Sequence, residues 1–313
     1  MRIYLAPIQG ITDRIYRNVY PIYFKGVDQA FAPFISSVAT AGIDSRLIRD
    51  VYPRSDLGLP TVPQVMSSNP GDFIRLANHL YEIGYRTVNW NLGCPFRIVM
   101  KKGRGAGMLC HPDRIEAFLE NTIPHLKPSL SIKLRLGTKF PDDILHILPI
   151  FNRFNLEEII IHPRTGLQMY EGAVDLDTFE KCLQLTKHRV IYNGDIDSPS
   201  ILDDLARRFD TVNCWMIGRG LLKNPFLAEE IKNHPQKPFG EKIKILRTFH
   251  DHLFDEYASK LAGPAHLLNK MKEIWTYMGG FLEDGKKVQK KIQKVQSIDR
   301  YVHLVARIFD EIP

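Results

Sequence analysis

Eight short runs of apolar and β-branched residues recur along the first part of the chain, and each is followed by a stretch with helical periodicity. The runs cover residues 3–8, 30–35, 61–66, 87–91, 131–136, 158–162, 189–193 and 212–217. Alternation of continuous apolar strands with helices predicts a parallel sheet covered by helices. Eight repeats in about 230 residues favour a closed α/β structure, the (β/α)8 TIM barrel, over an open doubly wound sheet. No GxGxxG motif follows the first run, which counts against a Rossmann fold.

Local signals mark where some of the intervening helices begin and end. Asn69 can cap a helix that has Pro70 in its first turn, and Gly84 closes that helix. Ser198-Pro199 repeats the same start signal. These signals support helices between the predicted strands.

The strand pattern stops after the segment 234–238, and residues 241–312 have helical patterns only. Glycines break these helices at three places, namely Gly263-Pro264, Gly279-Gly280 and Gly285. We therefore expect a catalytic (β/α)8 barrel over residues 1–235 and a smaller all-α domain over residues 236–313.

Composition and charge fit this division. The chain has 313 residues, of which 44% are apolar and 25% charged, so it can form one large globular domain and a smaller one. Residues 232–313 hold 15 Lys and Arg against 10 Asp and Glu, so roughly +5 of the net charge of +7 lies there. This excess favours a polyanionic partner, although a solvated surface is also compatible with it.

The sequence carries no signal for a membrane, a metal or a disulfide framework. No stretch approaches the length of apolar sequence that a membrane span needs, so we expect a soluble cytoplasmic protein without a membrane partner. The cysteines form no CxxC pair and no Cys/His cluster with metal-ligand spacing. They are Cys94, Cys110, Cys182 and Cys214.

Polar residues and glycines end almost every predicted strand. In a barrel of this type the active site forms at the carboxyl ends of the strands, so these residues are the candidates for binding and chemistry. In chain order they are Pro7, Gln9, Gln64, Asn91, Cys94, Lys133, Arg135, His162, Arg164, Asn193, Gly194, Asp195, Gly218 and Arg219.

The loops after the last two strands are candidates for a phosphate site. In barrels, these loops and the start of the following helix commonly hold a phosphate through backbone N–H groups. Gly194, Gly218 and Gly220 allow close approach of the backbone, and Arg219 adds positive charge. Alternatively, these glycines simply form turns.

Lys133 and Arg135 lie two residues apart on one predicted strand, so both face into the barrel. A buried lysine needs an anionic partner, which either the N1–C2=O edge of a reduced flavin or an acidic neighbour would supply. His162 ends the next strand beside Arg164 and is either a site residue or a core histidine with satisfied hydrogen bonds.

Cys94 lies in a turn between Gly93 and Pro95, and a basic glycine-rich segment, residues 101–107, follows. A thiol on a mobile loop suits a proton donor that closes over a substrate. A lone cysteine is otherwise inert, which is our interpretation of Cys110, Cys182 and Cys214.

Six ordered motifs resemble those of the dihydrouridine synthases, FMN enzymes that reduce uridines in tRNA. They are APIQGIT, NLGCP with KKGRGAGML, SIKLRLG, IHPRT, YNGDI and MIGRGLLKNPF, and they extend from residue 1 to about residue 230. The basic helical region that follows is similar to the RNA-recruiting domain of that family, although its motifs are weak.

The resemblance implies a role for each motif residue. Cys94 would be the proton donor, and Asn91 would help to hold the substrate near the flavin. The flavin ring would contact Pro7, Gln9, Gln64, Lys133 and His162. Its ribityl phosphate would be bound by Asn193, Gly194, Asp195, Gly218 and Arg219. Arg135 and Arg164 would face the substrate or the flavin.

Three positions depart from the family pattern. Asn89 stands where an acidic residue is common, Pro163 where a small residue is common, and Ile8 where methionine is common. Asn89 puts the hydrogen bonding around the cysteine loop in question. None of the three changes removes a group that the chemistry needs.

The reaction implied is reduction of specific uridines in tRNA to 5,6-dihydrouridine. Hydride from flavin N5 would add to C6 of uracil while Cys94 delivers a proton to C5. NADPH or NADH would reduce the flavin after transient docking, which requires no second dinucleotide fold. The target base must leave its stack, so uridines in loops are favoured.

The segment 286–295 is a candidate contact for RNA phosphates. At 100° per residue its apolar positions fall on one side of a helix. The lysines fall on the opposite side and are Lys286, Lys287, Lys290, Lys291 and Lys294. A solvated helix face is the alternative.

Two other functions stay open. A small-molecule flavin barrel, such as a dihydroorotate dehydrogenase or an ene-reductase, would share the phosphate site and the hydride chemistry. A non-catalytic RNA-binding barrel would retain no FMN. We expect a monomer, and the sequence implies no protein partner.

Overall fold

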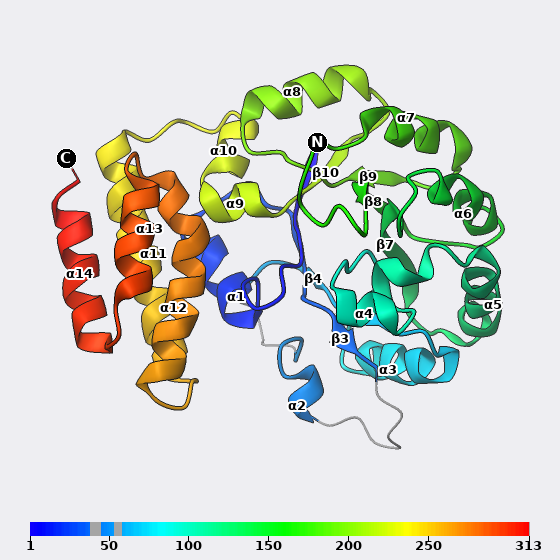
Figure 1. The fold of residues 1–313 in the computed structure, drawn as a ribbon, viewed down its shortest axis with the longest axis horizontal. Coiled ribbons are helices and arrows are strands. Elements are labelled where there is room, and N and C mark those ends of the chain that lie inside the picture. The colour runs from blue at the N-terminus through cyan, green and yellow to red at the C-terminus, as the bar shows by residue number, and fades with distance from the viewer. Residues whose placement is uncertain (38–44, 53–57, 313) are drawn as a thin grey trace.

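The computed structural model describes residues 1–37, 45–52 and 58–312. One parallel sheet of ten strands forms its centre (Figure 1). The strands are β1 (Arg2–Leu5), β2 (Gln29–Phe31), β3 (Ile35–Ser36), β4 (Thr61–Val62), β5 (Gln64–Met66), β6 (Thr87–Leu92), β7 (Ser129–Gly137), β8 (Ile159–Thr165), β9 (Val190–Tyr192) and β10 (Cys214–Ile217).

All eight predicted runs form strands, but two of them are divided by a proline. Pro33 separates β2 from β3, and Pro63 separates β4 from β5. Proline lacks the N–H group that a continuous ladder needs, which accounts for both interruptions.

Strand pairing closes the sheet into the predicted barrel. β2 pairs with β4 and β3 pairs with β5, so the two divided segments lie side by side. The other strands follow in chain order from β5 to β10, and β10 pairs with β1, which pairs with β2. Eight segments therefore make a closed ring, and their carboxyl ends meet at one mouth.

Helices cover the outside of the barrel (Figure 1). They are α1 (Arg14–Tyr23), α2 (Ser45–Ile48), α3 (Pro70–Glu82), α4 (Arg97–Lys101), α5 (Pro112–Thr122), α6 (Asp143–Phe151), α7 (Leu176–Leu185), α8 (Pro199–Arg208), α9 (Arg219–Lys223) and α10 (Leu227–Ile231), with 3-10 helices η1 (Gly105–Met108) and η2 (Ile123–His125). The predicted caps are present: Asn69 accepts a hydrogen bond from Asp72 N, and Ser198 accepts one from Ile201 N.

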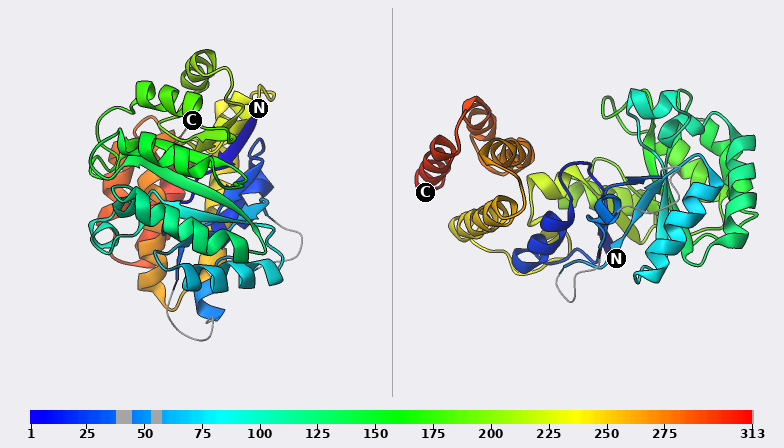
Figure 2. Two further views of the ribbon diagram at one scale, coloured as in Figure 1. Left: turned by 90° about the vertical axis from the view of Figure 1, so that its right-hand side faces the viewer. Right: turned by 90° about the horizontal axis from the view of Figure 1, so that it is seen from below.

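The C-terminal region is helical and stands beside the barrel next to α1 (Figures 1 and 2). Its helices are α11 (Phe239–Ala258), α12 (Pro264–Met278), η3 (Gly279–Phe281), α13 (Gly285–Lys294) and α14 (Ile298–Asp310). They break at the glycines singled out in the sequence and also at residues 295–297, between α13 and α14, where no break was predicted. The predicted boundary at residue 235 falls between α10 and α11. Phe249 of α11 packs edge-on against Tyr16 and Phe24, at ring distances of 5.7 and 4.9 Å, so an aromatic cluster joins the two regions.

The interior of the barrel is filled with side chains below its mouth. This inner cluster consists of Tyr4, Ala6, Phe31, Val62, Ile160, Ile191, Cys214 and Met216. The barrel is thus a packed core rather than a pore, and a ligand can enter only above these residues. None of the helices within the described ranges is long and apolar enough to cross a membrane.

Candidate active site

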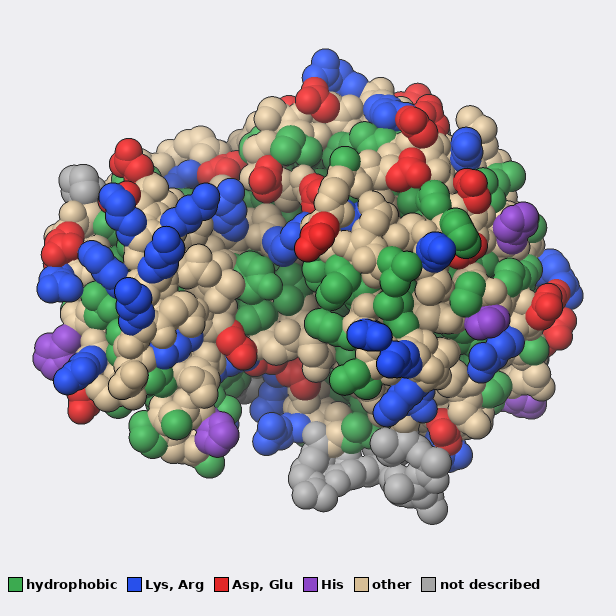
Figure 3. Space-filling view, in the orientation of Figure 1, with side chains coloured by type: hydrophobic (Ala, Val, Ile, Leu, Met, Phe, Trp, Pro, Cys, Tyr) green, Lys and Arg blue, Asp and Glu red, His purple; other side chains and the backbone are tan. Residues whose placement is uncertain are grey.

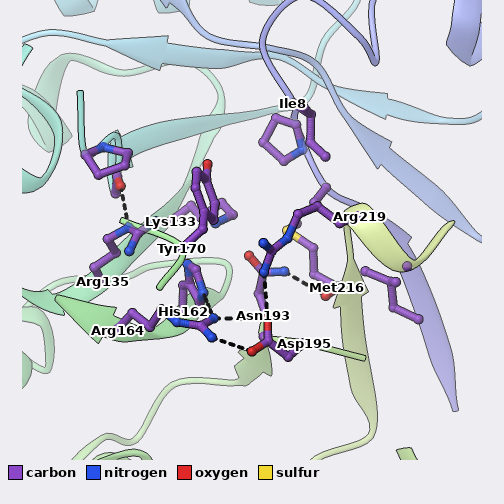
Figure 4. A pocket seen from close by; sticks show the side chains of 18 of the residues that line it. Ile8, Lys133, Arg135, His162, Arg164, Tyr170, Asn193, Asp195, Met216 and Arg219 are labelled. Carbon is purple, nitrogen blue, oxygen red and sulfur yellow. Dashed lines mark hydrogen bonds and ion pairs between the residues drawn. The ribbon is translucent and has the colours of Figure 1, made fainter. Parts of the chain in front are cut away.

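A cavity of about 910 Å³ opens at the carboxyl ends of the strands (Figure 4). All fourteen strand-end residues singled out from the sequence line it, from Pro7 and Gln9 after β1 to Gly218 and Arg219 after β10. Further lining side chains were not anticipated, among them Tyr170 after β8, Lys223 of α9 and Tyr277 of α12. The five lysines of residues 286–294 do not line the cavity.

One wall of the cavity is a chain of neutral hydrogen bonds across β5, β6 and β7. Asn91 Nδ2 donates to Gln64 Oε1 at 2.6 Å, and Gln64 Nε2 donates to Asn89 Oδ1 at 2.7 Å. Asn89 Nδ2 donates to Ser131 Oγ at 2.9 Å. All four side chains are buried. Asn89 therefore extends an uncharged network that ends at Asn91.

Asn91 also fixes the turn that carries Cys94. Its Oδ1 accepts hydrogen bonds from the backbone N–H groups of Gly93 at 3.0 Å and of Cys94 at 2.9 Å. The side-chain amide has two N–H donors, and only one of them is used by Gln64. Asn91 thus positions the thiol and keeps one donor for a ligand.

Burial sets the protonation state of Cys94, whose residue is only 6% exposed. Burial raises the pKa of the Cys94 thiol, and a backbone N–H of Phe96 and the charges of Arg135 and Lys133 offset only part of this effect. The group therefore stays a thiol at neutral pH, which is the form that can donate a proton.

The glycine-rich segment after α4 packs beneath this turn. Ala106 N donates to Cys94 O at 3.0 Å. Gly105 has a φ of +54°, and a Cβ there would lie 2.7 Å from Cys94 O; one on Gly107 would lie 2.4 Å from Met100 O. Close packing thus requires these glycines, whereas the sequence suggested a mobile loop.

Lys133 reaches the cavity from β7 beside this wall (Figure 4). Burial, and then the charge of Arg135, lowers the pKa of Lys133 to about 7. Its ammonium group has no carboxylate partner among the residues that the structure describes, so no internal salt bridge accounts for it. The cavity has room for an anionic group that would supply one.

The opposite wall, from β8 to β10, is held by charge. Asp195 Oδ1 accepts from Arg164 Nη1 at 3.0 Å and from Arg219 Nη2 at 2.7 Å (Figure 4). Burial would raise the pKa of Asp195, but hydrogen bonds and charge from Arg164 and Arg219 hold it below its usual value. Arg164 is 2% exposed and also donates to Gly172 O at 2.6 Å. This triad fixes the loop after β9, where Asp195 has a φ of +41°.

His162 is a neutral acceptor in this wall. Burial, with the charges of Arg135, Lys133 and other cations, holds the pKa of His162 far below its ordinary range. Its Nε2 lies 3.1 Å from Arg164 Nη1. Because a guanidinium only donates, Nε2 must accept and the imidazole proton sits on Nδ1.

Arg135 ties the two walls together. Its Nε donates to Gly93 O at 3.0 Å and its Nη1 donates to Thr165 O at 2.9 Å. The ring of Tyr170 lies 5.2 Å from the Arg135 guanidinium carbon and 5.0 Å from that of Arg219. Tyr170 lies five positions after the IHPRT motif and could have been considered for that reason, whereas nothing local indicates Tyr277.

Close backbone contacts shape the proposed phosphate end of the cavity. Asn193 Nδ2 donates to Met216 O at 2.8 Å, which links β9 to β10. A Cβ on Gly220 would lie 2.1 Å from Ile196 O, so only glycine lets the two loops meet. A Cβ on Gly218 would lie 3.3 Å from Ala6 and Ile8. Cations outnumber carboxylates in the lining: Lys133, Arg135, Arg164, Arg219 and Lys223 against Asp195 and Asp197.

Hydrogen bonds from the C-terminal helices hold the loop after β1. Lys270 Nζ donates to Gly10 O at 2.6 Å and to Asp13 Oδ2 at 2.5 Å. Tyr257 OH donates to Asp13 Oδ1 at 2.8 Å. Asp13 also caps α1 through Tyr16 N. The loop that carries Pro7 and Gln9 is therefore held from the helical side.

The lysines of α13 lie on the surface, as the sequence predicted. All five are exposed, while Ile292 on the other side of the helix is buried. Lys287 pairs with Asp284 at 3.0 Å. Figure 3 shows the basic side chains of the C-terminal helices on the same face of the molecule as the hollow between the two regions.

The fold and the site together define a barrel with a cationic cavity, which can bind an anionic ligand beside a buried thiol. No group of His, Cys, Asp and Glu within the described parts of the chain could hold a metal ion. The dihydrouridine synthase (Dus) family profile matches residues 4–311. The chain therefore belongs to the dihydrouridine synthase family, whose members are flavin-dependent oxidoreductases.

Individual relatives agree with this assignment. The chain is 27% identical over 271 residues to tRNA-dihydrouridine synthase B of Vibrio vulnificus, covering 84% of this chain and 83% of that one. It is 28% identical over 288 residues to a probable tRNA-dihydrouridine synthase 2 of Bacillus subtilis, with coverage of 88% and 85%.

Solved structures share the fold. Morphinone reductase superimposes with a TM-score of 0.51 at 11% identity and covers 77% of this chain and 88% of its own. An old yellow enzyme homologue from Zymomonas mobilis gives 0.50 at 12% identity, with coverage of 77% and 94%. At such identities the likeness shows the barrel architecture alone.

Proposed function

We propose that this chain reduces uridines in tRNA to 5,6-dihydrouridine, with FMN in the barrel cavity and NADPH or NADH as the reductant. The observation that carries the proposal is that one cavity holds both the buried thiol of Cys94 and Lys133, which has no carboxylate partner among the described residues. Both relatives described above are named for this reaction on tRNA.

The charges and hydrogen-bond donors of the cavity suit FMN. Lys133, with a pKa near 7, gains a partner when an anionic ring edge lies beside it. His162 Nδ1 carries a proton that it can donate to a ring acceptor. Arg219 and the backbone at Gly194 and Gly218 would hold the phosphate. The carboxylate of Asp195 repels phosphate, so its contribution is to orient Arg164 and Arg219. When bound, FMN supplies the hydride for C6 of uracil.

Cys94 supplies the proton in this proposal. Uracil is conjugated through C5=C6 to its C4 carbonyl, so addition at C6 must be matched by protonation at C5. The thiol keeps its proton because it is buried, and Asn91 fixes the backbone that aims it. Arg135 holds this turn against the β8 strand end. General acid catalysis by a positioned group contributes about 10²- to 10⁴-fold.

The tRNA would reach the cavity with its target base turned out of the stack, which costs a few kcal/mol and favours loop uridines. Exposed Lys286, Lys290 and their neighbours on α13 are suited to phosphates elsewhere on the RNA. Reversal of their charge should weaken binding of tRNA and flatten its salt dependence while FMN content stays constant. Unchanged affinity would exclude this face.

The visible spectrum of the purified protein is the first test. We expect a flavin spectrum that bleaches with NADPH and recovers as dihydrouridine forms in an unmodified tRNA transcript. Faster reduction of free uracil derivatives than of tRNA would instead favour a small-molecule flavin enzyme. A protein that FMN cannot reconstitute would favour an RNA-binding barrel without catalysis.

A further inference from the structure

Exposed apolar side chains gather at the mouth of the barrel. Thirteen large apolar residues are exposed among those described, and six of them come from the loops after β6, β7 and β8. They are Phe96, Ile98, Phe140, Leu167, Met169 and Tyr170, with exposures of 39 to 74%. Phe96 and Tyr170 also line the cavity, so this apolar surface is continuous with the active site.

Hydrogen bonds join the three loops into one surface. Thr138 Oγ1, after β7, donates to Ala106 O at 2.6 Å, and Leu167 N, after β8, donates to Thr138 O at 3.0 Å. Ala106 N in turn donates to Cys94 O. A Cβ on Gly166 would lie 2.9 Å from Met100 Sδ, which shows how closely the loops meet. Phe140 and the segment after Cys94 are therefore held in place relative to each other.

Cations border this apolar surface. Residues 93–111 include Arg97, Lys101, Lys102 and Arg104 and no acidic residue. Lys139 Nζ lies 5.1 Å from the centre of the Phe140 ring. Figure 3 shows hydrophobic side chains bordered by basic ones over α4. Exposed aromatic rings beside cations are the combination that binds single-stranded nucleic acid, because bases stack while the backbone is neutralised.

We propose that Phe96 and Phe140 form a stacking platform for the unpaired nucleotides that flank the target uridine, with Lys101, Lys102 and Lys139 neutralising their phosphates. The proposal rests on the proposed function, since it assumes a uridine in the cavity. Of the RNA, the cavity holds only the target base. The platform would keep the nucleotides on either side of that base from stacking back into the RNA helix. The positive charge favours RNA over an apolar protein segment as the occupant.

The test combines protein variants with tRNA transcripts that lack one base. Wild-type protein first identifies the modified uridine, and abasic sites are then placed one nucleotide to either side of it. We expect Phe140→Ala to lower kcat/KM for the intact transcript about tenfold, as loss of a stacked base does. Phe140→Trp should retain most of the activity. FMN content should be unchanged, because Phe140 is 60% exposed and its removal leaves no cavity.

The test depends on whether the effects of the Phe140→Ala substitution and of the abasic site are coupled. If the base stacks on Phe140, wild-type protein should show a kcat/KM about tenfold lower for one of the two abasic transcripts than for the intact one. Phe140→Ala should cause no further loss with that abasic transcript. Phe239→Ala, at another exposed phenylalanine, on α11, is the control and should lower kcat/KM for the intact and abasic transcripts by the same factor or not at all. Additive losses, or full activity of Phe140→Ala on tRNA, would overturn the platform. Absence of dihydrouridine with wild-type protein would instead overturn the proposed function.

Discussion

The two walls of the cavity are built with different chemistry. The wall that carries Cys94 is a chain of neutral amides and a hydroxyl, from Ser131 through Asn89 and Gln64 to Asn91. The wall from β8 to β10 is held by the ion pairs of Asp195 with Arg164 and Arg219. The neutral network holds the turn of the thiol with uncharged groups, so that burial outweighs the charges of Arg135 and Lys133 and the thiol keeps its proton, whereas the charged wall attracts an anion. The division predicts that proton transfer and cofactor binding can be impaired separately.

The largest effect is expected from removal of the thiol. Cys94→Ala should lower the rate of dihydrouridine formation about 10²- to 10⁴-fold, because it removes the group proposed to protonate C5. FMN content should stay constant, since the charged wall is intact. Cys110→Ala, at an exposed cysteine, is the matched control. A small loss for Cys94→Ala in a single-turnover assay would mean that another group donates the proton.

Loss of the central carboxylate should damage the charged wall. Asp195→Ala leaves the buried Arg164 without its ion pair and should lower the free energy of unfolding by about 2 kcal/mol, less than for a fully buried pair because Asp195 is 38% exposed. FMN affinity should fall as well. Asp177→Ala removes the exposed pair with Arg208 and should cost under about 1 kcal/mol. Urea denaturation measures both losses. Equal losses of unfolding free energy for Asp195→Ala and Asp177→Ala would contradict the difference expected between a half-buried and an exposed ion pair.

A smaller effect is expected when the thiol remains but its turn is loosened. Asn91→Ala removes the acceptor for the N–H groups of Gly93 and Cys94, which is worth about 1–3 kcal/mol when such donors stay buried. We expect kcat to fall about tenfold with little change in FMN affinity. Asn193→Ala on the opposite wall should lower FMN affinity with little change in kcat. If Asn91→Ala and Asn193→Ala each lowered both kcat and FMN affinity, the two walls would not be independent.

The smallest effect is a proton linkage at Lys133. Its pKa near 7 means that the side chain is mostly neutral above that pH, whereas an anionic partner favours the ammonium form. FMN binding should therefore take up a proton above about pH 7, and affinity should fall about fivefold between pH 7 and 8. Calorimetry in buffers of different ionisation enthalpy measures this uptake. Lys133→Met should abolish it, and equal uptake in both proteins would exclude Lys133 as the group.

Residues within one strand or turn could be predicted from the sequence, because their spacing determines their direction. The eight strand segments, the alternation of Lys133 with Arg135 and the capping of α3 by Asn69 are of this kind. Two strands were predicted as continuous although Pro33 and Pro63 divide them. The rule against proline within a ladder would have indicated both breaks.

Contacts between distant segments were beyond local reasoning. Nothing near Asp195 in the sequence reveals that its carboxylate pairs with both Arg164 and Arg219. Tyr277 lines the cavity only because α12 packs beside α9, an arrangement that depends on the whole barrel. The same holds for the neutral network, since Asn89 and Ser131 meet only through the register of β6 with β7.

Because Lys270 and Tyr257 hydrogen-bond to Asp13, the C-terminal helices and the barrel are not structurally independent units. Exchange of the C-terminal helices between relatives would transplant part of the pocket rim along with the exposed lysines of α13, since the same helices supply Tyr277. Diversification of substrate choice in such a protein must therefore keep a few inward-facing residues of the helices constant while their outward faces vary.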